Sequence, residues 1–239
     1  MYKFILAFVV GLLSFNLNAQ IHINVVTEQW YPYNYHNQKG QVIGRATDKV
    51  KTILDKLKLS YTIKSYPWAR AMMIAQKNDN TLIYSIFKTP ERVDKFQWVC
   101  PLLPPVKVYL FKLKNRYDLK VNNLEQVKHH TISINRGDSS HEYLRSVGFE
   151  SGINLDVTSS DEVSINKLFL NRVDFLVQTE FTANQLLRSL NKPENSLTKV
   201  LELKDYSNNA ICMAFSLTTD QSLVNNFKNE LLKLNHQRK

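Results

Sequence analysis

The chain has 239 residues and a formal net charge of +10, with 44% hydrophobic and 22% charged residues. This length can bury one large core or two smaller ones. Its Lys and Arg residues are scattered, without a run of five or a basic helix. The composition therefore argues against a nucleic-acid-binding protein, which normally carries a clustered basic patch or stripe.

The first residues have the pattern of a secretory signal peptide. Lys3 precedes an apolar run at 4–15, and Ala19 is a small residue at a suitable cleavage position. The run is too short, and its flanks are wrong, for a stable membrane span. We predict a signal peptide at 1–19, cleavage near Ala19, and export to the periplasm.

The chain has two cysteines, Cys100 and Cys212, each in an apolar, strand-like segment. An exported location permits a disulfide, but the sequence does not give the geometry that a disulfide needs. We predict two buried free thiols, with a Cys100–Cys212 disulfide as the alternative. Neither cysteine lies in a motif that indicates metal binding or nucleophilic chemistry.

Strand and helix signals alternate in the first part of the chain. Apolar residues at period two or in short buried runs predict strands, and apolar residues at the helical period predict helices. The predicted strands are 21–25, 61–64 and 81–86, and the predicted helices are 48–57 and 69–76. This alternation is typical of an α/β lobe with a largely parallel sheet.

The alternating pattern starts again at about residue 124. The predicted elements are a short helical turn at 124–127, strands at 131–135 and 174–177, a helix around Tyr143, a helix capped by Ser160, and a helix at 181–190. Further strands at 106–110 and 210–216 flank this region, and a last helix follows at 220–234. We therefore predict an α/β protein of two Rossmann-like lobes in series.

One polar turn stands out between the predicted strand 81–86 and an aromatic strand. The segment 84–92 contains Ser85, Thr89 and Arg92. Hydroxyls, free amides and a guanidinium at the end of a sheet can hold a small anion. The alternative is a surface Arg92 that pairs with Glu91 or Asp94.

Several motifs occur together in a characteristic order. They are Thr-Glu-Gln-Trp-Tyr-Pro-Tyr at 27–33 with Gly40, Gly44 and Asp48, Pro-Trp-Ala-Arg-Ala at 67–71, the turn at 84–92, the segment 124–137, and Asn-Arg-Val-Asp-Phe-Leu-Val at 171–177. In this order and spacing, nearly the whole mature chain resembles the family 3 periplasmic solute-binding proteins. The resemblance implies a type II periplasmic binding fold, in which two crossing strands form a hinge. It places lobe 1 at 20–107 and 211–239, and lobe 2 at 108–210.

The resemblance also implies ligand-binding roles in the first lobe. Trp30 would stack on or cap the solute, with loop packing as the alternative. Ser85 and Arg92 would hold an anionic group such as a carboxylate. Phe87 makes this wall of the pocket more apolar than in typical amino-acid binders.

In the second lobe, the resemblance points to five more residues. Free amides at Gly137, Asp138 and Ser139 open a helix and suit an anion, although Asp138 can instead serve as an N-cap. Amino-acid binders of the family carry an Asp where this chain has Thr179, with Glu180 one residue later. Because a Thr cannot offset a buried ammonium, either Glu180 replaces that Asp or the solute is not a standard α-amino acid.

Two enzymatic readings are weaker alternatives. Gly-Asp-Ser at 137–139 with His141 is reminiscent of a serine hydrolase, and some members of this fold act as dehydratases, for which Glu180 or Asp138 could be the general acid. The six His show no metal-ligand spacing, and no Gly-rich phosphate loop is present. We therefore predict a monomeric, non-enzymatic binding protein without cofactor, whose partners are a small polar solute and a membrane ABC permease or sensor kinase.

Overall fold

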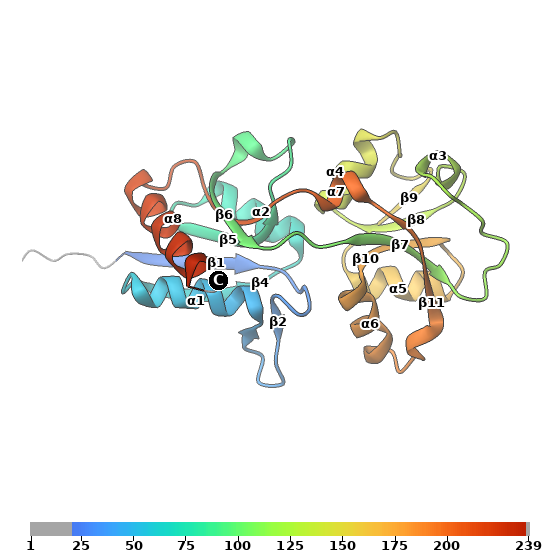
Figure 1. The fold of residues 1–239 in the computed structure, drawn as a ribbon, viewed down its shortest axis with the longest axis horizontal. Coiled ribbons are helices and arrows are strands. Elements are labelled where there is room, and N and C mark those ends of the chain that lie inside the picture. Colours follow the sequence, from blue (N-terminus) through green and yellow to red (C-terminus); the bar gives the residue numbers. More distant parts are fainter. Residues whose placement is uncertain (1–20, 238–239) are drawn as a thin grey trace, which may run out of the picture.

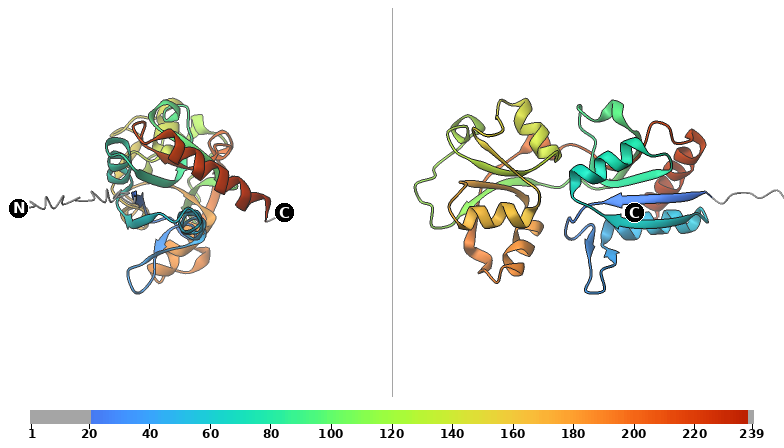
Figure 2. Two further views of the ribbon diagram at one scale, coloured as in Figure 1. Left: turned by 90° about the vertical axis from the view of Figure 1, so that its left-hand side faces the viewer. Right: turned by 180° about the vertical axis from the view of Figure 1, so that it is seen from behind.

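The computed structural model describes residues 21–237, so the predicted signal peptide lies outside the described part of the chain. Figure 1 shows two α/β lobes joined by two extended segments, one leading from β6 to β7 and one from α7 to β12. The first and last elements, β1 and α8, both belong to the same lobe (Figure 2). No helix between residues 21 and 237 is long and apolar enough to cross a membrane.

Lobe 1 is built on a five-stranded sheet in the order β4-β1-β5-β12-β6. Its strands are β1 (His22–Thr27), β4 (Ser60–Ser65), β5 (Thr81–Phe87), β6 (Gln97–Leu103) and β12 (Ile211–Phe215). Strands β4, β1 and β5 are parallel, whereas β12 is antiparallel to both of its neighbours. Every residue of β5 and β12 is buried, as expected for strands at the centre of a covered sheet.

Three helices, a 3-10 turn and a small hairpin complete lobe 1. They are α1 (Arg45–Lys56), α2 (Trp68–Lys77), α8 (Gln221–His236), the 3-10 turn η1 (Val93–Lys95), and the hairpin of β2 (Tyr35–His36) and β3 (Val42–Ile43). Helix α1 buries Val50, Ile53 and Leu54, which share one face at the helical period. Gly44 caps this helix at φ +123, where a Cβ would lie 2.5 Å from the Tyr33 carbonyl oxygen. Only glycine fits there, so Gly44 fixes the loop that carries Trp30.

Lobe 2 repeats the arrangement of lobe 1. Its strands are β7 (Val108–Leu113), β8 (Ile132–Asn135), β9 (Leu155–Thr158), β10 (Phe175–Thr179) and β11 (Leu197–Glu202), in the order β11-β7-β10-β8-β9. In each sheet three strands pair in parallel, and the remaining two join the sheet by antiparallel pairing. The helical elements are α3 (Leu124–Val127), α4 (Ser139–Ser146), α5 (Asp161–Phe169), α6 (Glu180–Ser189), η2 (Glu194–Ser196) and α7 (Lys204–Ser207). The predicted fold class is thus confirmed, although β9 and β11 were not predicted.

The two cysteines form a disulfide between β6 and β12, so the prediction of free thiols is wrong. Cys100 and Cys212 have an S–S distance of 2.08 Å and a Cα–Cα distance of 4.6 Å. The two strands pair antiparallel, with Ile211 opposite Leu103 and Met213 opposite Val99, which brings the cysteines together. The bond therefore joins the two strands of lobe 1 that connect to the crossing segments.

The lobe boundaries after residues 107 and 210 stay a prediction.

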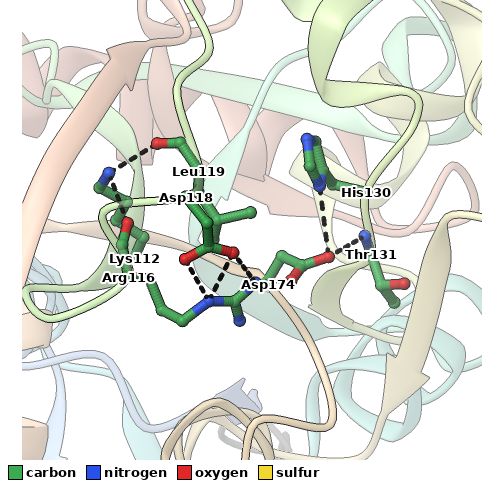
Figure 3. A network of polar contacts seen from close by, with 7 residues as sticks. All are labelled: Lys112, Arg116, Asp118, Leu119, His130, Thr131 and Asp174. Carbon is green, nitrogen blue, oxygen red and sulfur yellow. Dashed lines mark hydrogen bonds and ion pairs between the residues drawn. The ribbon is translucent and has the colours of Figure 1, made fainter.

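A polar network in lobe 2 explains the motif at 171–177 (Figure 3). Arg116 makes a forked contact with Asp118 and reaches Asp174 at 2.9 Å. Asp174 also accepts a hydrogen bond from the Thr131 backbone amide at 3.1 Å and lies 3.6 Å from His130. Asp174 therefore ties the turn after β7 to the start of β8. This network serves the folding of lobe 2 and takes no part in the cleft described below.

Candidate ligand cleft

Two adjoining cavities lie where the lobes meet. The larger, here called the outer chamber, has a volume of about 600 Å³ and is lined by segments of both lobes, including 65–70, 159–162 and 182–189. The smaller, here called the inner pocket, has a volume of about 40 Å³. Both cavities share Glu28, Gln29, Trp68, Asn135 and Asp161 in their linings. A solute can therefore place one group in the inner pocket while its body occupies the outer chamber.

The inner pocket is formed by strand ends from both sheets. Glu28 follows β1, and Ser85 and Phe87 lie at the end of β5. From lobe 2, Asn135 ends β8 and Thr179 ends β10. Side chains at the carboxyl ends of parallel strands meet in the crevice outside the sheet, which is where α/β folds bind ligands.

Three carboxylates face the inner pocket: Glu28, Asp138 and Asp161. Burial, together with the charge of Asp138, raises the pKa of Asp161 to about 7. Burial is also the main cause that raises the pKa of Glu28 well above its ordinary value, and Asp138 and Asp161 add to it. Among the described residues that line this pocket there is no Lys or Arg. The pocket therefore favours a positive charge.

Hydrogen bonds hold one of these carboxylates, that of Asp161, in position. Asp161 Oδ1 accepts from Asn135 Nδ2 at 2.7 Å and from Gln178 Nε2 at 2.6 Å. Ser160 is the N-cap of α5, as predicted, and accepts from the Val163 amide, which makes Asp161 the first residue of the helix. The capped start of α5 thus aims the Asp161 carboxylate at the pocket.

Aromatic rings form the apolar walls. The Phe87 ring stacks on Tyr206 at a centroid distance of 5.0 Å and lies 5.7 Å from Trp30. Trp68 borders both cavities and donates a hydrogen bond from Nε1 to the Gly137 carbonyl at 2.8 Å. Aromatic faces beside carboxylates are suited to organic cations, because both attract positive charge.

The structure brings six of the residues predicted from the sequence to the inner pocket: Trp30, Ser85, Phe87, Asp138, Ser139 and Thr179. Several of their polar atoms already have partners within the protein. Ser85 Oγ donates to Asn34 Oδ1 at 2.5 Å, and Ser139 Oγ lies 2.7 Å from the Tyr206 hydroxyl. Thr179 caps α6 by accepting from the Thr182 amide at 3.2 Å.

Two other residues predicted to bind the ligand, Gly137 and Glu180, line neither the outer chamber nor the inner pocket. Gly137 has a φ of +69, and its carbonyl accepts hydrogen bonds from Trp68 and Arg92 of lobe 1. Glu180 is more than half exposed and pairs with Lys199 at 2.9 Å. The structure therefore does not place Glu180 where it could replace the family's Asp or act as a general acid on a bound solute.

Arg92 is fully buried, so its alternative reading as a surface residue paired with Glu91 or Asp94 is wrong. Its Nε lies 2.8 Å from Glu142 Oε2 in α4, and its Nη2 donates to the Gly137 carbonyl at 2.9 Å. The guanidinium lies 5.3 Å from the centre of the Trp68 ring. Arg70, by contrast, stacks on Tyr66 at 4.8 Å.

These contacts cross between the lobes. Arg92 of lobe 1 pairs with Glu142 of lobe 2, and Trp68 of lobe 1 binds Gly137 of lobe 2. On the other side of the cleft, Thr182 Oγ1 donates to the Tyr31 carbonyl at 3.2 Å. The lobes are therefore closed on one another in this structure.

The geometry does not favour a hydrolase or a metal site. The ring nitrogens of His141 contact the Gly137 amide and Ser151 Oγ rather than the hydroxyl of Ser139. Ser139 Oγ instead bonds Asp138 and Tyr206. Within residues 21–237, no group of three or more His, Cys, Asp or Glu side chains is arranged to hold a metal ion.

The sequence analysis missed Glu28, Asp161 and Tyr206 as pocket residues. In the sequence, Glu28 appeared only as part of the motif at 27–33, and Asp161 appeared only as the residue after a predicted helix cap. Tyr206 comes from the short helix α7, which was not predicted. A usable signal for Asp161 was its place directly after the Ser160 cap, at the start of a helix that follows a strand.

The family assignment rests on a match over most of the chain. The family model described as "Bacterial extracellular solute-binding proteins, family 3" matches residues 23–236. The chain belongs to this family. No match was found among the curated proteins.

Solved structures with the same fold are known, and each covers about 90% of this solute-binding protein. An ancestral arginine-binding protein bound to arginine has 18% identity, a TM-score of 0.76, and coverage of 90% of this chain and 92% of its own. A histidine kinase sensor domain with similarity to periplasmic binding proteins has 17% identity and a TM-score of 0.75, with coverage of 90% and 91%. A substrate-binding protein of an amino-acid ABC transporter has 16% identity and a TM-score of 0.74, with coverage of 90% and 94%. At these identities the likeness establishes the fold.

Proposed function

We propose that this solute-binding protein acts in the periplasm and closes over a small organic cation that carries no carboxylate. The observation that carries the proposal is the inner pocket, where Glu28, Asp138 and Asp161 face aromatic walls without a lining Lys or Arg. The solute is passed to a membrane ABC permease or reported to a sensor kinase. Similarity to an ABC transporter component and to a kinase sensor domain supports both kinds of partner.

The electrostatics of the pocket favour a cation on energetic grounds. Carboxylates that are buried near one another lose hydration and repel each other, which favours their protonated forms. A bound ammonium or guanidinium offsets both penalties, because it pairs with the ionised carboxylates in a low-dielectric site. The rings of Trp30 and Trp68 add a favourable cation–π contribution of about 0.5–2 kcal/mol each.

The absence of a carboxylate in the solute is inferred from Arg92, because the other arginines near the cleft, Arg70 and Arg136, line only the outer chamber and not the inner pocket. By comparison with the family, Arg92 is the residue expected to hold a ligand carboxylate. Here its guanidinium is buried against Glu142 and the Gly137 carbonyl, and it belongs to neither cavity lining. A solute carboxylate in the inner pocket would instead meet three acidic side chains.

A thermal-shift panel tests the proposed function. The panel contains mono- and diamines, guanidinium compounds, neutral amides and dicarboxylic acids, each added to the mature protein after unfolding and refolding to strip bound solute. A cation present at 100 times its dissociation constant should stabilise the protein by about 2.7 kcal/mol. Stabilisation by dicarboxylic acids without any response to amines or guanidinium compounds would contradict the proposal.

The affinity for a permanently charged guanidinium probe should rise with pH. Because the pKa of Asp161 in the empty protein is about 7, this carboxyl is largely protonated at pH 6 and must release its proton to pair with the probe. The dissociation constant should fall by roughly tenfold between pH 6 and pH 8. Calorimetry in buffers of different ionisation enthalpy should show proton release at pH 6, and a pH-independent affinity would exclude Asp161 as a partner of the cation.

A further inference from the structure

We propose that Glu142 is this protein's own substitute for a solute carboxylate at Arg92, and that it thereby excludes carboxylate-bearing solutes. The inference deepens the proposed function and rests on it for the identity of the solute. Its structural basis is the pairing of Arg92 and Glu142 across the closed cleft.

Arg92 has the properties of a guanidinium built to hold an anion. It is the largest side chain with no exposure in the described chain, and it lies at the turn between β5 and η1. Trp68 covers one face of it at 5.3 Å, and the Gly137 carbonyl fixes Nη2. A buried guanidinium requires a negative partner, and Glu142 supplies it with Oε2 at 2.8 Å from Nε.

The pairing with Glu142 leaves some of the hydrogen-bond donors of Arg92 unused. The buried Nη1 of Arg92 has no hydrogen-bond partner, and neither Nε nor Glu142 Oε2 completes a directed hydrogen bond despite their closeness. A guanidinium bound by a free carboxylate normally forms two parallel hydrogen bonds. Glu142, which reaches Arg92 from the first turn of α4, therefore neutralises the charge without filling the donor set.

The position of Glu142 in lobe 2 explains how it would decide which solutes bind. It belongs to lobe 2, so it occupies Arg92 when the lobes close, at the step when a solute carboxylate would otherwise be bound. A solute that places a carboxylate at Arg92 would have to displace Glu142 and leave it without its cationic partner. A carboxylate-free cation meets no such competition.

Replacing Glu142 should create a binding site for small carboxylates at Arg92. We expect Glu142→Ala to melt at a lower temperature than the native protein, and we expect acetate to raise that temperature in a saturable manner at millimolar concentration. The native protein, the double variant Arg92→Ala/Glu142→Ala, and the control Glu125→Ala should show no saturable response to acetate. Glu125 lies in the same lobe with a side chain 78% exposed, so it controls for the loss of a charge.

A second variant keeps the proposal testable if Glu142→Ala does not fold. Glu142→Gln retains the side-chain volume but loses the charge. Its preference for an amine over the corresponding amino acid should fall by about tenfold relative to the native protein, because the Arg92 charge is no longer neutralised. No acetate response in Glu142→Ala, an equal response in the double variant, or an unchanged preference in Glu142→Gln would overturn the proposal.

The acetate experiment needs no knowledge of the natural solute. If amines fail to bind the native protein while acetate stabilises Glu142→Ala, the proposed function fails and the role of Glu142 stands as a replacement for an anion. If amines bind and acetate has no effect, the proposed function stands and Glu142 is reduced to a contact that stabilises closure.

Discussion

Asp161→Asn should weaken the binding of an organic cation by at least about 30-fold, since truncating one partner of a buried, hydrogen-bonded charge pair costs 2 kcal/mol or more. The side chain keeps its shape, and the hydrogen bonds from Asn135 and Gln178 meet an amide oxygen instead of a carboxylate. Titration calorimetry with a guanidinium probe at pH 8 measures the effect. Glu125→Gln, which removes an exposed carboxylate of the same lobe, should leave the affinity unchanged.

Asp161→Asn should also stabilise the ligand-free protein at pH 8. The pKa of Asp161 is raised in the folded state, so its ionisation opposes folding as the pH rises from about 4 through about 7. Asparagine removes this penalty because it does not ionise. Weaker binding together with a higher melting temperature of the empty protein would identify Asp161 as a binding residue that costs stability. A lower melting temperature together with weaker binding would instead indicate general damage to the pocket.

Loss of the Cys100–Cys212 disulfide should lower the free energy of unfolding by about 2–5 kcal/mol. The bond spans 112 residues of sequence, so reducing it restores a large amount of freedom to the unfolded chain. Denaturant unfolding of the double variant Cys100→Ser/Cys212→Ser, compared with the native protein, measures the loss. The two side chains lie in neither cavity lining.

Because neither cysteine lines a cavity, the affinity of the folded double variant Cys100→Ser/Cys212→Ser for the cationic probe should stay within about twofold of the native value, as expected for independent sites. Adding a reductant to the native protein should reproduce the stability loss. Equal midpoints for the oxidised and reduced protein would show that the bond contributes nothing to stability. A disulfide of this kind agrees with the predicted export, since oxidising compartments are where such bonds persist.

The fold was predictable because its signals are local. Alternating strand and helix patterns repeat in both halves of the chain, and buried faces such as that of α1 follow the helical period. Strands β9 and β11 were missed because they are short or half-exposed and lack a strong apolar pattern. Strands β2 and β3 were missed because each has only two residues. Helix α7 spans only four residues, too few for periodicity to appear.

The site was predictable only in part, because it depends on which strand ends and helix starts face each other. Ser85, Phe87 and Thr179 were identified through the resemblance to the family, and they lie at the ends of β5 and β10, two strands that the sequence predicted. Arg92 was predicted to hold a solute carboxylate, but its partner Glu142 lies 50 residues away in the other lobe and could not be inferred from spacing. The disulfide was missed for the same reason, since the pairing of β6 with β12 joins distant parts of the chain.

The most direct test of the account compares the affinities of arginine and agmatine, which is arginine without its carboxylate, for the native protein at pH 8. Both carry a guanidinium, so the comparison isolates the carboxylate. We expect agmatine to bind at least about tenfold more tightly, a difference of about 1.4 kcal/mol. Tighter binding of arginine, with loss of that advantage in Arg92→Ala, would show that Arg92 holds a solute carboxylate after all and would contradict the central claim.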